Sequence, residues 1–412
     1  MNENPKKKKI IYFGKFDKYI VVLLIGGLTE FFKDWFASNT AFDSYSLLKS
    51  LANALGMAFA GVFVIYKKCR GVARKDSVSY SVQKKENKEN LNENGTEGEA
   101  ADINNEIRVV QKKQKKYERK RMIIKYSLLF LNAFIDVVST IILNLFTKGV
   151  KVHCILASIL FISLFCFLLF KEKIYRHHLL CTLIITLLSL GHDFIADNFD
   201  GTDYHIIFKI LFNILYGLNL TLMKFIMTNY FSPPYEACFW QGLFEVIIYI
   251  IPFIIYYKYP DYIISIRYGA PDPTKKPDNI YEYFNVHAEL LDLLKFFAIV
   301  LFYFVYNMCV FMAMNHLTVC SYLIMNYFGE IPNFIKDNVS DGFESKNLYY
   351  LFEYLGILFF ALVYNEVIEL NILSLNKYTK INIQERGIKD ADADNILDET
   401  NSFHEHTINQ GD

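Results

Sequence analysis

Ten apolar stretches, each about as long as a membrane-spanning helix, occupy most of this 412-residue chain. A hydrocarbon core about 30 Å thick needs about 20 apolar residues per helix, and a soluble fold has no use for so many such stretches. Hydrophobic residues make up 53% of the chain, which lies beyond the composition of ordinary soluble domains. The pattern predicts an all-α integral membrane protein with ten transmembrane helices, at residues 19–36, 46–66, 122–146, 153–170, 178–195, 205–228, 235–257, 290–314, 317–335 and 349–370.

The ten stretches divide into two halves of five. Two five-helix repeats of inverted topology are a common construction in transporters. The predicted halves are residues 1–195, which include a polar cytoplasmic segment at 67–121, and residues 205–371. Residues 372–412 are polar and are predicted to form a disordered cytoplasmic tail.

Lysine and arginine predict the orientation of the chain, because cytoplasmic loops carry an excess of both. They are concentrated in the N-terminal tail, in residues 67–121 and in residues 171–178. The loop after the fifth stretch instead carries Asp193, Asp197, Asp200 and Asp203, with no lysine or arginine. We therefore expect both termini to lie in the cytoplasm.

Two polar segments interrupt the apolar pattern. Residues 75–106 are rich in Lys, Glu and Asn and nearly free of large apolar residues, so they are predicted to be a linker that buries no core. Residues 107–121 are interpreted either as a basic stretch that only holds this loop in the cytoplasm or as a short helix on an anionic leaflet. Residues 258–285 contain several prolines and are predicted to be a polar loop.

Polar residues recur at helical spacing inside the predicted spans, where lipid exposure is costly. Asp136 lies near mid-membrane, one turn from Asn132, with no basic residue close in sequence. It is a candidate for substrate contact or proton coupling, with a structural bond to a neighbouring helix as the alternative. For Glu30, the alternative is an ion pair with Lys33. The predicted substrate pathway is formed by Glu30, Asn132, Asp136, Asn213, Asn219, Trp240, Gln241, Glu245, Asn326, Tyr327 and Glu330.

Within that set, two kinds of side chain have distinct expected roles. Asp136 and Glu330 are the candidate charge-handling groups. Trp240 and Tyr327 offer flat aromatic faces on which a ring-bearing cargo would stack.

The sequence carries no enzymatic constellation. It has no phosphate-binding loop, no HExxH and no GxSxG motif, so no catalytic residue, no metal ligand and no cofactor is predicted. His177 and His178 stand in a basic turn without convincing metal partners. The seven cysteines include no CxxC pair and are interpreted as small buried apolar side chains.

Three helix junctions carry a recognisable arrangement. Residues 224–242 read KFIMTNYFSPPYEACFWQG, residues 170–179 read FKEKIYRHHL, and the tenth stretch runs from Gly356 to a Tyr-Asn-Glu ending at Glu366. In order and spacing, these segments resemble the drug/metabolite transporter superfamily, in its EamA-like, eukaryotic branch related to nucleotide-sugar transporters. The resemblance implies ten helices around a central cavity and alternating access by rocking of the two halves.

We therefore expect a multi-pass secondary transporter or exchanger that moves a small polar metabolite by alternating access through a central cavity. Two alternatives stay open: a non-transporting membrane receptor or scaffold of the same fold, and a channel or membrane-embedded enzyme. The expected partners are a small polar metabolite, with nucleotide-linked and ring-bearing cargoes included, and membrane lipids, but no nucleic acid. A homodimer is left open. The expected location is an endomembrane (Golgi, ER or vacuolar) or the plasma membrane of a eukaryote.

Overall fold

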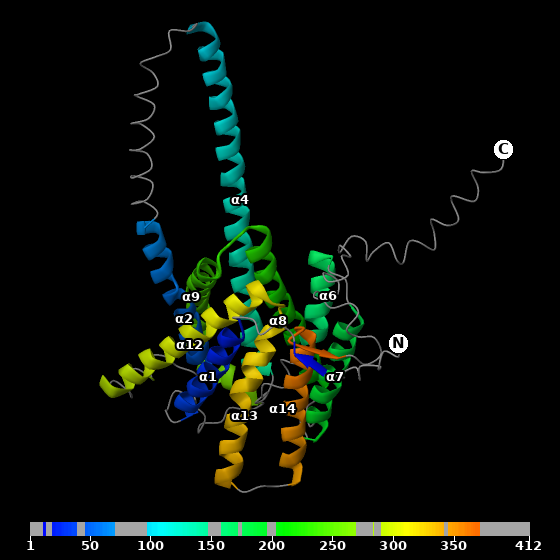
Figure 1. Ribbon diagram of the computed structural model, residues 1–412. Helices are drawn as coiled ribbons and strands as arrows, with labels where there is room; N and C mark the ends of the chain where they lie inside the picture. Colours follow the sequence, from blue (N-terminus) through cyan, green and yellow to red (C-terminus); the bar gives the residue numbers. More distant parts are fainter. Residues whose placement is uncertain are drawn as a thin grey trace, which may run out of the picture.

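The computed structural model describes residues 11–13, 19–38, 46–70, 97–146, 158–171, 175–195, 203–268, 283, 290–341 and 345–370, which form a bundle of helices (Figure 1). The helices are α1 (Tyr19–Ser38), α2 (Ser46–Phe59), α4 (Glu97–Phe146), α6 (Ser158–Phe170), α7 (Arg176–Ile195), α8 (Asp203–Asn229), α9 (Pro234–Lys258), α10 (Pro260–Tyr268), α12 (Leu290–His316), α13 (Ser321–Asp341) and α14 (Ser345–Tyr364). Helical backbone continues past α2, from residue 61 to residue 70. The predicted tail at 372–412 lies outside the described residues.

Among the described helices, five are long and apolar enough to cross a membrane. These five are Leu47–Arg70, Lys116–Leu145, Ile207–Asn229, Pro234–Lys258 and Leu290–His316. The apolar helices Ser158–Phe170, Arg176–Ser189 and Leu348–Tyr364 are shorter. The sequences of α1 and α13 include three and four charged residues, respectively. The part of the chain that the structure describes is therefore almost wholly helical, and it has the character of a multi-pass membrane protein.

The outer surface of the bundle is apolar, as a lipid-facing surface must be. Ile251 on α9 is 62% exposed, Leu183 on α7 is 56% exposed and Phe352 on α14 is 65% exposed. Water would make such a surface a strong driver of aggregation, whereas hydrocarbon solvates it without cost.

The end of α14 corrects the predicted tenth span, which was expected to continue to residue 370. The helix stops at Tyr364, where Glu366 takes a left-handed backbone conformation with φ of 58°. The amide of Glu366 donates to the Val363 carbonyl and that of Val367 to the Leu362 carbonyl, each at 3.0 Å, which is the Schellman arrangement that ends a helix. An acidic side chain thus occupies a position where glycine is usual.

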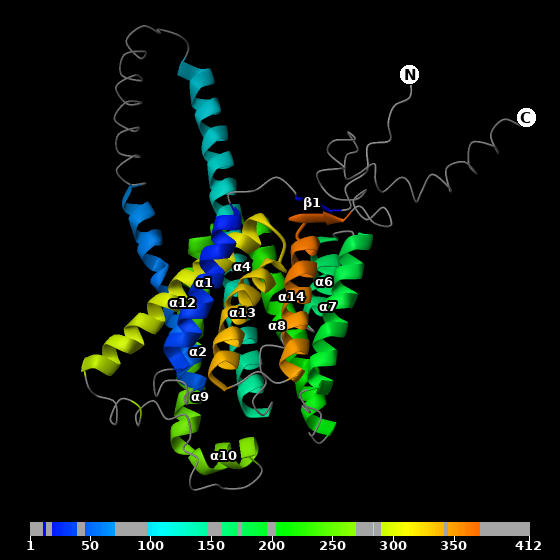
Figure 2. The same ribbon diagram turned by 60° about the horizontal axis from the view of Figure 1, so that its bottom comes forward.

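After this turn the chain forms a short strand instead of more helix. The strand β2 (Ile368–Leu370) pairs antiparallel with β1 (Ile11–Phe13), with Ile11 opposite Leu370 and Phe13 opposite Ile368. The pairing joins the segment before α1 to the segment after α14. Figure 2 shows this ribbon beside the end of α14, with α10 at the opposite end of the bundle. We call the end that carries the ribbon the ribbon end.

Two further loop predictions are corrected by helices. The chain is helical from Glu97, so the predicted linker at 75–106 is partly helix, and residues 107–121 are not a separate surface helix. They continue without a break into the third span as one 50-residue helix that projects beyond the bundle (Figure 1). Residues 97–121 are rich in Ala, Glu, Gln, Lys and Arg, which favour helix once the membrane part provides a nucleus. The predicted loop at 258–285 includes α10.

The packing of the bundle follows a regular scheme of helix pairs. α1 packs against α12 and α13, whereas α8 packs against α4 and α6. α2 contacts both α9 and α12, α4 contacts α9, and α7 packs against α14. Gly242 lets α9 approach α2 closely, since a Cβ at that position would stand 2.5 Å from the Ala54 carbonyl oxygen and the Ala58 amide nitrogen.

Candidate functional site

A buried group of polar side chains lies where α4, α8 and α9 meet. The Asn132 amide donates to the Asn219 oxygen at 2.6 Å and to the Gln241 oxygen at 3.2 Å. The Gln241 amide donates to Glu245 at 2.5 Å, and the Asn219 amide donates to the Asp136 carboxylate. The Asp136 and Glu245 carboxyl groups lie within hydrogen-bonding reach of one another. We call these five residues the α4–α8–α9 polar cluster.

Helical spacing explains how two of these helices each contribute two side chains. Asn132 and Asp136 are four residues apart on α4, and Gln241 and Glu245 are four residues apart on α9. Residues at this separation lie one turn apart on the same helix face. Each of these two helices therefore presents one amide and one carboxyl group. Asn219 of α8 bridges Asn132 and Asp136, because it is hydrogen-bonded to both.

The chemistry of the cluster is that of a pair of acids, of which Glu245 is buried and Asp136 is half-buried. An ionised carboxylate only accepts hydrogen bonds, so a hydrogen bond between Asp136 and Glu245 requires a proton on one of them. Among the described residues, neither carboxyl group forms an ion pair with a lysine or arginine. Glu245 is 1% exposed, which makes a second negative charge on the pair very costly. The cluster can therefore hold one proton, and it offers amide donors and acceptors to a polar solute.

A second polar group surrounds Lys33 on α1. The Lys33 ammonium lies 2.7 Å from the Glu30 carboxylate and 3.5 Å from the Asp34 carboxylate. It also stands 5.0 Å from the ring centres of Tyr303 and Tyr306 on α12. Glu30 is thus held in the internal ion pair that the sequence left as an alternative.

Asn326 joins this second group through α12, because the Tyr306 hydroxyl donates to its side-chain oxygen. Two predicted pathway residues, Glu30 and Asn326, are therefore brought into one neighbourhood by a tyrosine that sequence reasoning did not single out. We call the set of Glu30, Lys33, Asp34, Tyr303, Tyr306 and Asn326 the Lys33 cluster.

Other predicted residues lie elsewhere. Asn213 donates to the Lys209 carbonyl at 2.9 Å, within α8. Trp240 packs 4.9 Å from the Tyr126 ring in an aromatic group, and Tyr327 is fully buried with its ring 5.7 Å from that of Tyr354. Glu330 is half-buried on α13 near Tyr327. None of the described contacts of Asn213, Trp240 and Tyr327 reaches the α4–α8–α9 polar cluster.

Sequence reasoning missed several polar contacts between helices, among them Ser158–Tyr322 and a bond between α12 and α2. The Asn307 amide on α12 donates to the Asn53 oxygen on α2 at 2.7 Å. Asn307 stands in an apolar stretch, and a single asparagine there carries little signal on its own. The pairing becomes visible only when the two helices are placed side by side.

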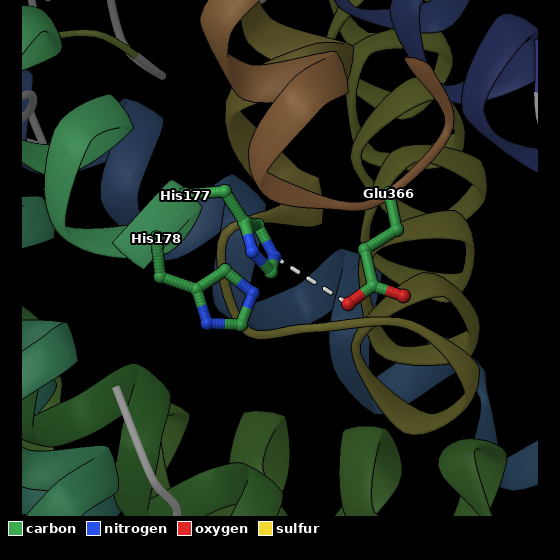
Figure 3. Close-up of side chains that lie close together, drawn as sticks. All are labelled: His177, His178 and Glu366. Carbon is green, nitrogen blue, oxygen red and sulfur yellow. Dashed lines mark ion pairs between the residues drawn. The ribbon is translucent and has the colours of Figure 1, made fainter. Parts of the chain in front are cut away.

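A third group combines the two histidines with a distant acid. His177 and His178 lie at the start of α7, and Figure 3 shows both rings near the Glu366 carboxylate. The ligand atoms of the three side chains all lie within 4.8 Å of one another, and the His177 Nε2 to Glu366 Oε1 distance is 3.4 Å. The sequence did not predict Glu366 as a partner for these histidines, because most of the second half of the chain separates them.

Comparison with known proteins does not assign this chain to a family. No protein-family model matches it. No curated protein matches it either. The class that the fold and the site define is therefore a multi-pass helical membrane protein with polar groups buried between its helices.

Proposed function

We propose that this chain is a secondary transporter or exchanger of the drug/metabolite transporter type. Its ten spans are α1, α2, α4, α6, α7, α8, α9, α12, α13 and α14, arranged as two inverted five-helix repeats. It moves a small polar metabolite across an endomembrane or the plasma membrane of a eukaryotic cell by alternating access. The observation that carries the proposal is the α4–α8–α9 polar cluster inside an apolar bundle, in which four polar side chains are buried and Asp136 is half-buried.

The helix pairs support two related halves. When the spans are numbered in chain order, α1 pairs with spans eight and nine, while α8, the sixth span, pairs with spans three and four. If each span is replaced by the span five places away in the chain, the contacts of α1 become the contacts of α8, and the contacts of α8 become those of α1. The pairs α2–α9 and α7–α14 become themselves under the same exchange. Internally repeated transporters have such a scheme of contacts.

Two hydrogen bonds obey the same exchange. The Asn132–Gln241 bond joins the third span to the seventh, and the Asn307–Asn53 bond joins the eighth span to the second. Hydrogen bonds between side-chain amides at equivalent helix pairs are expected if the two halves descend from one ancestral arrangement of helices. The acid pair spans the two proposed halves, because Asp136 is on α4 and Glu245 is on α9.

The cargo is argued from what the polar cluster can bind. Side-chain amides at Asn132, Asn219 and Gln241 provide donors and acceptors for hydroxyl, amide or base groups of a solute. The Asp136–Glu245 pair holds a proton that a cargo or a conformational change displaces. Intramembrane carboxyl groups commonly mark such pathways and proton relays.

Basic side chains at the ribbon end support a cytoplasmic assignment for that end. Lys125 pairs with Glu236 at 2.7 Å, Arg121 donates to the Asn229 carbonyl at 3.0 Å, and Lys224 donates to the Leu317 carbonyl at 2.6 Å. These contacts join α4, α8, α9 and the turn before α13. An excess of Lys and Arg is the mark of the cytoplasmic side of a membrane protein.

An uptake screen in proteoliposomes tests the proposal. The full-length chain is reconstituted, and pools of small polar metabolites, including nucleotide-linked sugars, nucleosides and amino acids, are offered outside. We expect one pool to accumulate in vesicles with the wild-type chain and not with Asp136→Leu. Asp261→Asn, an acid on exposed α10 outside both polar clusters, is the matched control and should transport normally.

The alternatives appear as distinct outcomes of the same screen. Correctly folded protein that accumulates nothing, while one metabolite raises its melting temperature, would favour a receptor over a transporter. Flux that does not saturate with concentration would favour a channel. Normal uptake by Asp136→Leu would mean that the polar cluster is only structural.

A further inference from the structure

The group formed by His177, His178 and Glu366 is separate from both polar clusters. Its members come from two places in the chain: the first turn of α7 and the turn that ends α14 (Figure 3). Glu366 is held there by the Schellman turn, directly before β2. Two imidazoles and one carboxylate are thus presented by elements whose backbones are fixed by their own hydrogen bonds.

His177 has two ring nitrogens that could bind a ligand. It is 3% exposed, and neither of its ring nitrogens has a hydrogen-bond partner among the described residues. Its Nε2 faces Glu366 Oε1 at 3.4 Å. A buried imidazole without hydrogen bonds is costly, and a bound cation is one common way to remove that cost.

The distances suit a tetrahedral transition-metal ion. Zinc bonds of about 2.0–2.2 Å to nitrogen and oxygen place neighbouring ligand atoms roughly 3.3 Å apart. The His177–Glu366 separation of 3.4 Å matches this value. The overall spread of 4.8 Å requires the partly exposed His178 ring to turn toward the ion, which rotation about its side-chain bonds allows.

Neighbouring aromatic rings hold the two imidazoles in place. Tyr175 stacks on His177 with 4° between the ring planes, and the Tyr364 ring centre lies 4.6 Å from that of His178. Groups that orient histidine ligands commonly strengthen metal sites. Here the orientation comes from packing rather than from hydrogen bonds.

We propose that His177, His178 and Glu366 form a binding site for a divalent transition-metal cation of the zinc class. Imidazole nitrogen and carboxylate oxygen suit zinc, whereas magnesium prefers oxygen ligands alone. The three side chains leave a fourth position for water. A bound ion would connect the start of α7 to the segment between α14 and β2, so it would stabilise the ribbon end of the bundle. This inference rests on the three side chains and is independent of the proposed transport function.

Zinc binding by the purified full-length chain tests the site. The protein in detergent is freed of metal with a chelator and titrated with Zn²⁺ alone in excess Mg²⁺. We expect one tight site per chain in the wild type, and an affinity weaker by roughly tenfold or more in His177→Ala and in Glu366→Gln. His316→Ala, a histidine near the ribbon end outside the group, is the matched control and should bind like the wild type.

Glu366→Gln keeps the size of the side chain, so it decides the question even if His177→Ala fails to fold. Cobalt in place of zinc provides a second readout, because four-coordinate Co²⁺ absorbs strongly in the visible range. We expect that absorption in the wild type and its loss in Glu366→Gln. Equal zinc affinity in the wild type and in Glu366→Gln, or no tight site in the wild type, would overturn the proposal.

Discussion

Asp136 on α4 and Glu245 on α9 are carboxyl groups on two different helices, and they lie within hydrogen-bonding reach of one another. Each is also held by an amide, Asp136 by Asn219 and Glu245 by Gln241. The pair therefore links the position of one helix to the protonation of a group on another. A transporter that couples proton movement to helix movement needs such a link, and a purely structural bundle would be served as well by leucine.

If the two carboxyl groups share one proton, the effects of their substitutions should not add. Asp136→Asn and Glu245→Gln each remove the acid while keeping a hydrogen-bonding side chain of the same size. We expect each single variant to lower the uptake rate and flatten its pH dependence, and the double variant to be no worse than the poorer single variant. Rates of uptake across a pH series measure this. Additive effects would mean two independent acids.

The amide hydrogen bonds of the polar cluster should matter for stability. Asn132→Ala leaves the Asn219 and Gln241 oxygens without their donor, which should cost about 1–3 kcal/mol per buried group. A lower melting temperature in detergent measures this cost. Asn229→Ala changes an exposed side chain near the end of α8 and should have little effect. A variant at Asn132 as stable as the wild type would mean that water replaces the lost donor.

The Lys33 cluster should tolerate paired changes better than single ones. Lys33→Met leaves the buried Glu30 carboxylate without its cation, and breaking a buried pair in this way typically costs about 3–5 kcal/mol. Adding Glu30→Gln removes the stranded charge and should restore part of the stability. Yield and melting temperature of the single and double variants test this. A double variant less stable than Lys33→Met would contradict it.

The close contact between α2 and α9 predicts that only glycine is tolerated at position 242. Gly242→Ala places a methyl group 2.5 Å from backbone atoms of α2, so the helices must move apart and the protein should lose stability. Gly356→Ala is the matched control, since its nearest neighbour is the flexible end of Leu188 at 3.2 Å. Comparable melting temperatures for the two variants would show that this helix contact is loose.

Orientation predicts which positions a water-soluble thiol reagent reaches. In a cysteine-free background, Tyr262→Cys on α10 should react from the non-cytoplasmic side, and Lys120→Cys on α4 only after the membrane is permeabilised. Both side chains are exposed, so reactivity reports the side of the membrane and not burial. The reverse pattern of labelling would invert the topology.

The sequence predicted where helices form better than where they end. A helix lies in each of the ten predicted stretches, and five of these helices are long and apolar enough to cross a membrane. The stop at Tyr364 depends on a left-handed backbone at Glu366, a residue with no special preference for that conformation. The outward extension of α4 was predicted only in part: a short helix was one interpretation of residues 107–121, whereas residues 97–106 were assigned to a linker because they are polar.

The candidate site was predictable only in part, for a physical reason. Asn132 with Asp136 and Gln241 with Glu245 stand at helical spacing, so the sequence itself marks them as pairs on one face. Contacts between helices follow from packing that no local pattern records. Neither the bond between Asn307 and Asn53 nor the approach of Glu366 to His177 could be predicted in that way.

The central claim is that the Asp136–Glu245 pair carries a proton during transport, and proton flux tests it most directly. Vesicles containing the full-length chain and a trapped pH-sensitive dye are exposed to the metabolite found in the uptake screen. The account predicts a dye response that requires both the metabolite and the wild-type chain, and that is absent in the Asp136→Asn, Glu245→Gln double variant. A double variant that takes up the metabolite with an unchanged dye response would contradict it.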